Sequence, residues 1–200
     1  MNVRSLLITV VAAMLTSGAL AQTPLRCNWP VARKSLEDML ASDQKDQRQD
    51  PERLVESDKE NQRRLDGIVA SCGWPPLSKV GRLASDAAFL IVQHSDLGNQ
   101  LRYAPLMQRA SEQGELSRQS MALLEDRINI QKGLPQRYGT QVSISHGKTS
   151  LFPVAEEATL DQRRAELGLP PICEYLQSFS AQYGPVAYPR CKSPVAKSPH

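Results

Sequence analysis

The sequence lacks the patterns by which many metal proteins and hydrolases are recognised. It has only 3 histidines, and it contains no C-x-x-C pair, no H-E-x-x-H and no G-x-S-x-G. These patterns are typical of zinc sites and of nucleophile elbows, so we predict no metal site and no cofactor. The 24 basic and 21 acidic side chains are interleaved along the chain. This excludes the clustered cationic face that nucleic acid requires.

The first 21 residues have the three parts of a secretory signal peptide. Arg4 lies in a short basic region, an apolar run covers residues 6–15, and Ala19-Leu20-Ala21 precedes Gln22. The run is too short for a membrane helix, which needs about 20 apolar residues. We therefore predict a signal peptide (1–21), a single helical domain (22–183) and a proline-rich C-terminal tail (184–200). The protein would be periplasmic or secreted, with no membrane span after signal cleavage.

Apolar residues recur at helical spacing through most of the remaining chain. The pattern predicts helices at about 31–48, 57–72, 78–96, 97–113, 115–132, 160–168 and 172–183. Pro51 favours a loop over residues 49–57, and Pro105 favours a kink or interruption of the fourth helix. Only residues 138–154 alternate polar and apolar side chains, which indicates a hairpin. The predicted fold class is mainly α, an irregular antiparallel helical domain with one small β-hairpin.

Residues 78–96 are the most apolar segment after the signal peptide, and we predict that they form the central helix. Ser78 would cap its N-terminus. His94 continues the apolar stripe of Ala87 and Ile91, so we expect its ring to be at least partly buried near the end of this helix.

The direction of the helices predicts where polar groups meet. Consecutive helices joined by short connections pack antiparallel, which brings several helix ends together. Burying an unpaired charge costs several kcal/mol, so polar groups at these ends must satisfy each other or a ligand. We predict a polar pocket that contains Asp58, Asn61, His94 and Arg127. The alternative is a structural network that ties the helix ends together.

Four cysteines in an exported chain indicate two disulfides. The same rule of helix direction places Cys27, before the first helix, beside Cys72, at the end of the second. This predicts a Cys27–Cys72 disulfide and therefore a Cys173–Cys191 disulfide.

Six short motifs resemble the motif series of a bacterial domain family of unknown function. They are G-W-P at 73–75, V-G at 80–81, Q-H-x-D at 93–96, D-R at 126–127, Q-x-Y-G-T-Q at 136–141 and D-x-R-R at 161–164. The resemblance covers about residues 36–175 and implies a domain boundary but no chemistry. It marks eight positions: His94, Asp96, Asp126, Arg127, Gln136, Tyr138, Thr140 and Gln141.

The sequence leaves three functions open. The first is binding of a polar small molecule or peptide, in which Arg127 holds an anionic group. The predicted ligand-binding residues are Asn61, His94, Arg127, Gln136, Tyr138, Thr140 and Gln141. The second is a hydrolase or transferase that uses His94 as general base, supported by Asp96 or Asp58. The third is a structural or interaction protein with a buried polar network.

Overall fold

The computed structural model describes residues 27–46, 51–145, 148–184 and 186–191. Over these residues the chain forms seven α-helices, one short 3-10 helix and three short strands. The predicted fold class is confirmed, since the fold is mainly α and includes an antiparallel hairpin. The predicted signal peptide lies outside the described residues, as do the last nine residues of the predicted tail.

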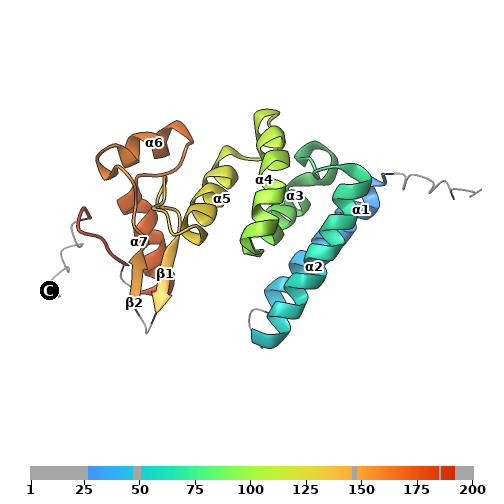
Figure 1. The fold of residues 1–200 in the computed structure, drawn as a ribbon, viewed down its shortest axis with the longest axis horizontal. Coiled ribbons are helices and arrows are strands. Elements are labelled where there is room, and N and C mark those ends of the chain that lie inside the picture. Colours follow the sequence, from blue (N-terminus) through green and yellow to red (C-terminus); the bar gives the residue numbers. More distant parts are fainter. Residues whose placement is uncertain (1–26, 47–50, 146–147, 185, 192–200) are drawn as a thin grey trace, which may run out of the picture.

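The first five helices form one core around α3 (Figure 1). They are α1 (Trp29–Asp46), α2 (Pro51–Cys72), α3 (Leu77–His94), α4 (Leu97–Glu112) and α5 (Arg118–Gln131). α3 contacts the other four, because apolar or small side chains cover most of its circumference. Leu36 of α1, Leu65 of α2, Met107 of α4 and Leu124 of α5 are fully buried around it.

The start of the second helix and the interruption of the fourth differ from the prediction. α2 begins at Pro51 instead of following a loop to Ser57. Proline favours the first position of a helix, because its missing N–H would have no helical partner there. α4 continues through Pro105 to Glu112. Pro105 and Leu101 are both exposed, so water can satisfy the Leu101 carbonyl that loses its donor.

The start of α3 also differs from the prediction. Ser78 is not the N-cap but the second residue of the helix, and its N–H and hydroxyl donate to the Glu115 carboxylate at 2.8 and 2.7 Å. The helix then breaks at Gly81, which has φ 77° and ψ 170°. A residue with a Cβ is strained at this φ, so the glycine permits the kink that turns the rest of α3 into the core.

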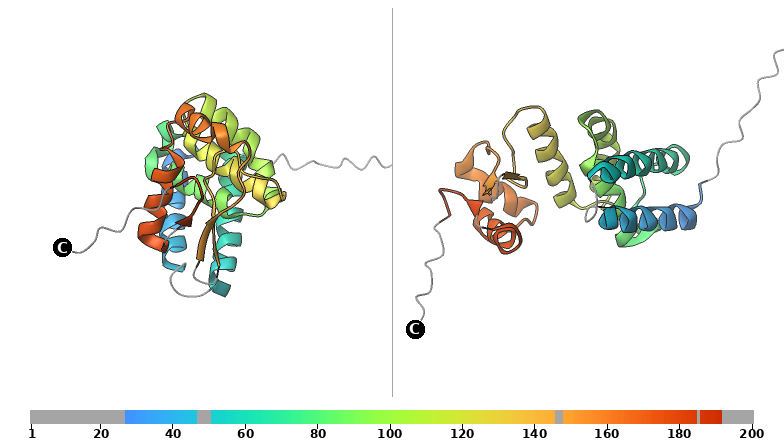
Figure 2. Two further views of the ribbon diagram at one scale, coloured as in Figure 1. Left: turned by 90° about the vertical axis from the view of Figure 1, so that its left-hand side faces the viewer. Right: turned by 90° about the horizontal axis from the view of Figure 1, so that it is seen from below.

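The C-terminal part packs on the other side of α5 from α1–α4 (Figures 1 and 2). β1 (Val142–Ser145) and β2 (Lys148–Leu151) pair antiparallel, with Val142 opposite Leu151. They are followed by a 3-10 helix, η1 (Glu157–Thr159), and by α6 (Leu160–Glu166) and α7 (Ile172–Tyr183). A third strand, β3 (Val186–Ala187), pairs parallel with β2, so the folded part continues beyond Tyr183.

The two predicted disulfides are both present. Cys27 and Cys72 join the start of α1 to the end of α2, with their Cα atoms 4.8 Å apart. Cys173 of α7 joins Cys191 beyond β3, with a Cα separation of 5.4 Å. Disulfides of this kind are typical of proteins in oxidising compartments. None of the described helices is both long and apolar enough to cross a membrane.

Candidate functional site

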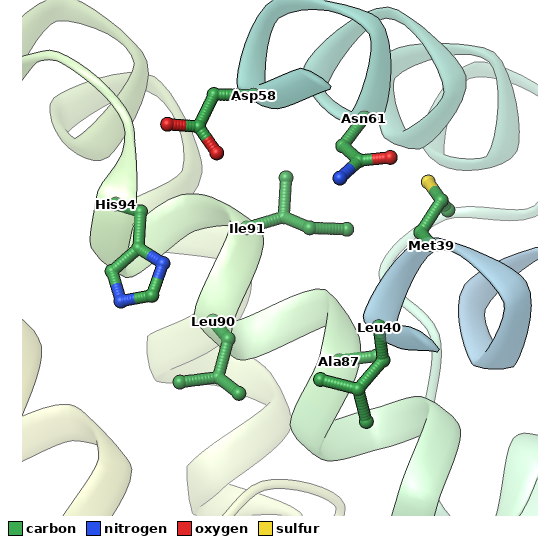
Figure 3. A pocket seen from close by; sticks show the side chains of 8 residues that line it. All are labelled: Met39, Leu40, Asp58, Asn61, Ala87, Leu90, Ile91 and His94. Carbon is green, nitrogen blue, oxygen red and sulfur yellow. The ribbon is translucent and has the colours of Figure 1, made fainter. Parts of the chain in front are cut away.

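Asp58, Asn61 and His94 come together, as the helix directions predicted. They line a small cavity of about 10 Å³ between α1, α2 and α3, together with Met39, Ile91 and other apolar side chains (Figure 3). This volume is close to the space that one water molecule needs. The cavity therefore has room for a single small polar group.

A larger cleft of about 430 Å³ adjoins this cavity and shares Asp58 and His94 with it. We call it the His94 cleft. It lies between the first half of α2 and the junction of α3 with α4. Its other polar lining residues are Lys59, Gln62, Arg63, Ser95, Asp96 and Asn99.

The ring of His94 is exposed, so the prediction that it is partly buried is wrong. α3 ends at His94, and the chain turns away into α4, so no further helical turn covers the ring. The imidazole makes no hydrogen bond or ion pair with another described residue. Both ring nitrogens are therefore available to a molecule in the cleft.

Asp96 does not orient His94. It is the N-cap of α4, where its two carboxylate oxygens accept the backbone N–H and the side-chain amide of Asn99, each at 2.9 Å. An aspartate is well suited to this position because the first N–H groups of a helix have no helical acceptor. Of the two predicted supports for His94, only Asp58 faces it across the cleft, and Asp58 is half-buried.

Asn61 combines burial with a lack of hydrogen bonds. Its side chain is 4% exposed, and within the described residues neither its amide oxygen nor its amide nitrogen has a partner. Its neighbour Gln62 donates to Asp66 at 2.9 Å. Buried amides are nearly always hydrogen-bonded in folded proteins. The amide oxygens of the buried Gln93 and Gln100 also lack a partner, but their nitrogens donate, whereas in Asn61 both atoms are unpaired within the described residues.

Arg127, Gln136, Tyr138, Thr140 and Gln141 do not line the His94 cleft or its cavity. Tyr138 and Thr140 donate to Asp126 instead, and Gln136 and Gln141 belong to the same segment. The Asp126 carboxylate is completely buried and accepts the backbone N–H groups of Arg137, Tyr138 and Thr140 at 2.7–3.0 Å, and the Thr140 hydroxyl at 2.9 Å. Asp126 thus fixes residues 137–140, which the alternating pattern had predicted to begin a strand.

The amides in this cluster are also engaged. Gln136 donates to the carbonyls of Gln141 and Phe152 at 3.1 and 3.0 Å, and its own oxygen accepts the Gln141 N–H at 2.7 Å. Gln141 donates to the Thr140 hydroxyl at 3.1 Å and approaches the Leu123 carbonyl at 3.5 Å. These two side chains therefore form hydrogen bonds within the protein and hold the fold of this segment, instead of presenting free polar groups to a ligand.

The two arginines of the D-x-R-R motif bind backbone carbonyls of the same segment. Arg164 is completely buried and donates to the carbonyls of Tyr138 and Pro170 at 2.6 and 2.7 Å. Arg163 donates to the carbonyls of Arg137 and Ala155 at 2.8 and 2.7 Å. Burial of the Arg164 guanidinium lowers its pKa, although nearby acidic groups oppose the effect.

A second polar cluster, which the sequence analysis missed, lies next to the cleft. Asp66 accepts Gln62 at 2.9 Å, Arg102 at 2.7 Å and the Tyr103 hydroxyl. Burial acts to raise the pKa of Asp66, but the hydrogen bonds from these three donors outweigh it and lower the pKa below its usual range. The i, i+4 spacing of Gln62 and Asp66 on one helix could have indicated their contact.

No group of three histidine, cysteine or carboxylate side chains is arranged to hold a metal ion in the described parts of the chain. A family model described as a family of unknown function (DUF6624) matches residues 49–187. No curated protein and no solved structure matches the chain.

Proposed function

The chain belongs to this family of unknown function, as its motifs predicted, and we propose that it is an exported protein that binds a polar small molecule or a peptide in the His94 cleft. Export is supported by the signal-peptide pattern of residues 1–21 and by the two disulfides.

One observation carries the binding proposal, namely the buried amide of Asn61 without a protein partner. Leaving a buried donor or acceptor unpaired costs about 1–3 kcal/mol. A purely structural network would be expected to avoid this cost by pairing the amide with a neighbour. A ligand group that enters the small cavity can both donate to and accept from this amide.

The other groups around the cavity define the ligand's chemistry. His94 offers a donor or an acceptor, and Asp58 offers a carboxylate on the opposite helix (Figure 3). Apolar side chains such as Leu90 and Ile91 also line the cavity. Ligand sites commonly combine apolar walls with a few placed polar groups. A hydroxyl, amide or amine at one end of the ligand fits the space and the groups present.

Thermal denaturation of the oxidised mature protein against periplasmic metabolites and cell-wall fragments tests the proposal. A ligand at a hundred times its Kd stabilises the native state by about 2.7 kcal/mol. We expect a compound that raises the melting temperature of the wild type. The increase should be smaller for Asn61→Ala and for His94→Ala, because each variant removes a polar group from the site.

Asn129→Ala is the matched control, because Asn129 is a half-exposed asparagine in a different groove, between α4 and α5. It should respond to the compound as the wild type does. Binding in the His94 cleft is excluded if every compound that stabilises the wild type stabilises Asn61→Ala and His94→Ala equally. It is also excluded if no compound in the set has any effect.

A further inference from the structure

Arg127 is a half-buried cation with no counter-ion among the described residues. It lies on α5, and its Nε–H is completely buried without a hydrogen-bond partner. Its guanidinium makes no hydrogen bond, ion pair or ring contact with any described residue. Burial lowers its pKa, and no acidic neighbour opposes that effect. Such a group is costly, since burying a charge without a partner is strongly unfavourable.

The other arginines that are at least half-buried in the described chain all have hydrogen-bond acceptors, although one buried nitrogen of Arg164, Nη2, has none. Arg64 donates to the carbonyl and hydroxyl of Ser35 at 3.3 and 2.9 Å. Arg163 and Arg164 donate to backbone carbonyls, and Arg164 also stacks over Tyr175. Each of these three guanidinium groups is thus held by at least two acceptors. Arg127 differs, because its guanidinium has no acceptor among the described residues.

Polar groups gather on α5 one helical turn before Arg127. There, the Leu123 carbonyl is approached by the side-chain amides of Gln93 at 3.4 Å and Gln141 at 3.5 Å. Residues four apart on a helix share a face, so Arg127 lies on the same face as these amides. Gln93 comes from the last turn of α3, and Gln141 from the segment after α5. Three parts of the chain thus meet at the turn of α5 that precedes Arg127.

We propose that Arg127 binds a carboxylate group of a small molecule, at a site separate from the His94 cleft. A guanidinium binds a carboxylate through two parallel N–H bonds, and this pairing would supply the missing partner of the buried Nε–H. One cation matches the single charge of a carboxylate better than the double charge of a phosphate. The site is independent of the proposed cleft ligand, because Arg127 does not line that cleft.

Acetate can serve as the probe. We compare the melting temperature in sodium acetate, sodium phosphate and sodium chloride at equal ionic strength, for the wild type, Arg127→Met and Arg109→Met. Arg109 is an exposed arginine on α4 and is the matched control. At about five times its Kd, acetate should raise the melting temperature of the wild type and of Arg109→Met by about 2–4 °C relative to chloride. It should not raise that of Arg127→Met.

A second readout uses the wild type alone. The buried Nε–H of Arg127 should give a slowly exchanging arginine side-chain resonance, and acetate should shift it in a saturable way. The proposal fails if this resonance does not move, or if acetate stabilises all three proteins equally or none. A larger effect of phosphate than of acetate would overturn the assignment to a carboxylate.

Discussion

Replacing Asn61 by leucine separates a ligand-binding role of this residue from a structural one. The amide is 4% exposed and has no hydrogen-bond partner in the described protein. A leucine would place apolar atoms against Met39, Leu40 and Ile91, which line the same cavity. The substitution removes a desolvation cost of about 1–3 kcal/mol and adds apolar contact. We therefore expect the free energy of unfolding to rise by about 1–2 kcal/mol.

The assay is urea denaturation of the oxidised protein at one pH, with Gln100→Leu as the control of opposite sign. Gln100 is also a buried amide, but its nitrogen donates to the carbonyls of Gln93 and Ser95 at 3.2 and 2.9 Å. Its replacement should lower the free energy of unfolding by about 1–3 kcal/mol, because these carbonyls lose their donor.

A loss of stability in Asn61→Leu as large as that in Gln100→Leu would refute the reasoning. It would mean that Asn61 contributes to folding through its polar atoms. Increased stability together with lost ligand response is the expected outcome, and it is the usual mark of a residue kept for function at the expense of stability.

Three further predictions concern the scaffold. Asp126→Asn should lower the free energy of unfolding by about 2–4 kcal/mol, because an amide nitrogen would face donors that need an acceptor; denaturant titration measures this. Gly139→Ala should cost about 1–3 kcal/mol in the same assay, since Gly139 has φ 65° and a Cβ would lie 3.2 Å from Ile172. The pKa of Asp66 is lowered on folding, so its contribution is complete above the unfolded value and is lost as the pH falls through the folded value. Asp66→Asn should therefore show a smaller loss of stability than the wild type between about pH 6 and about pH 3.

Much of the helical architecture could be predicted because it depends on local pattern. The spacing of apolar residues predicted α7 at residues 172–183, where the structure has it. The disulfide pairing followed from chain direction alone. Pro51 shows the limit of this reasoning, because a proline is compatible both with a loop and with the first position of a helix. The kink at Gly81 could not be predicted either, since a glycine is also tolerated within a helix.

The candidate site could be predicted only in part. Asp58, Asn61 and His94 come together because antiparallel packing places the last turn of α3 beside α2, although Asp58 and Asn61 lie within α2 and not at its end. Arg127 lies at the same end but does not line the cavity or the His94 cleft. Which face α5 presents depends on its rotation about its own axis. That rotation is fixed by Asp126 and its backbone donors in a segment with irregular structure, and helical periodicity carries no information about such contacts.

The Q-H-x-D motif shows how the last turn of α3 divides its residues between scaffold and cleft. The Gln93 amide approaches α5 at the Leu123 carbonyl, and Asp96 caps α4. His94, between them, lines the cleft and makes no hydrogen bond or ion pair within the described residues. Successive residues on a helix lie about 100° apart, so fixing Gln93 against α5 directs His94 away from α5. The packing of α3 on α5 thus leaves the exposed imidazole at the cleft, where both ring nitrogens can reach a ligand.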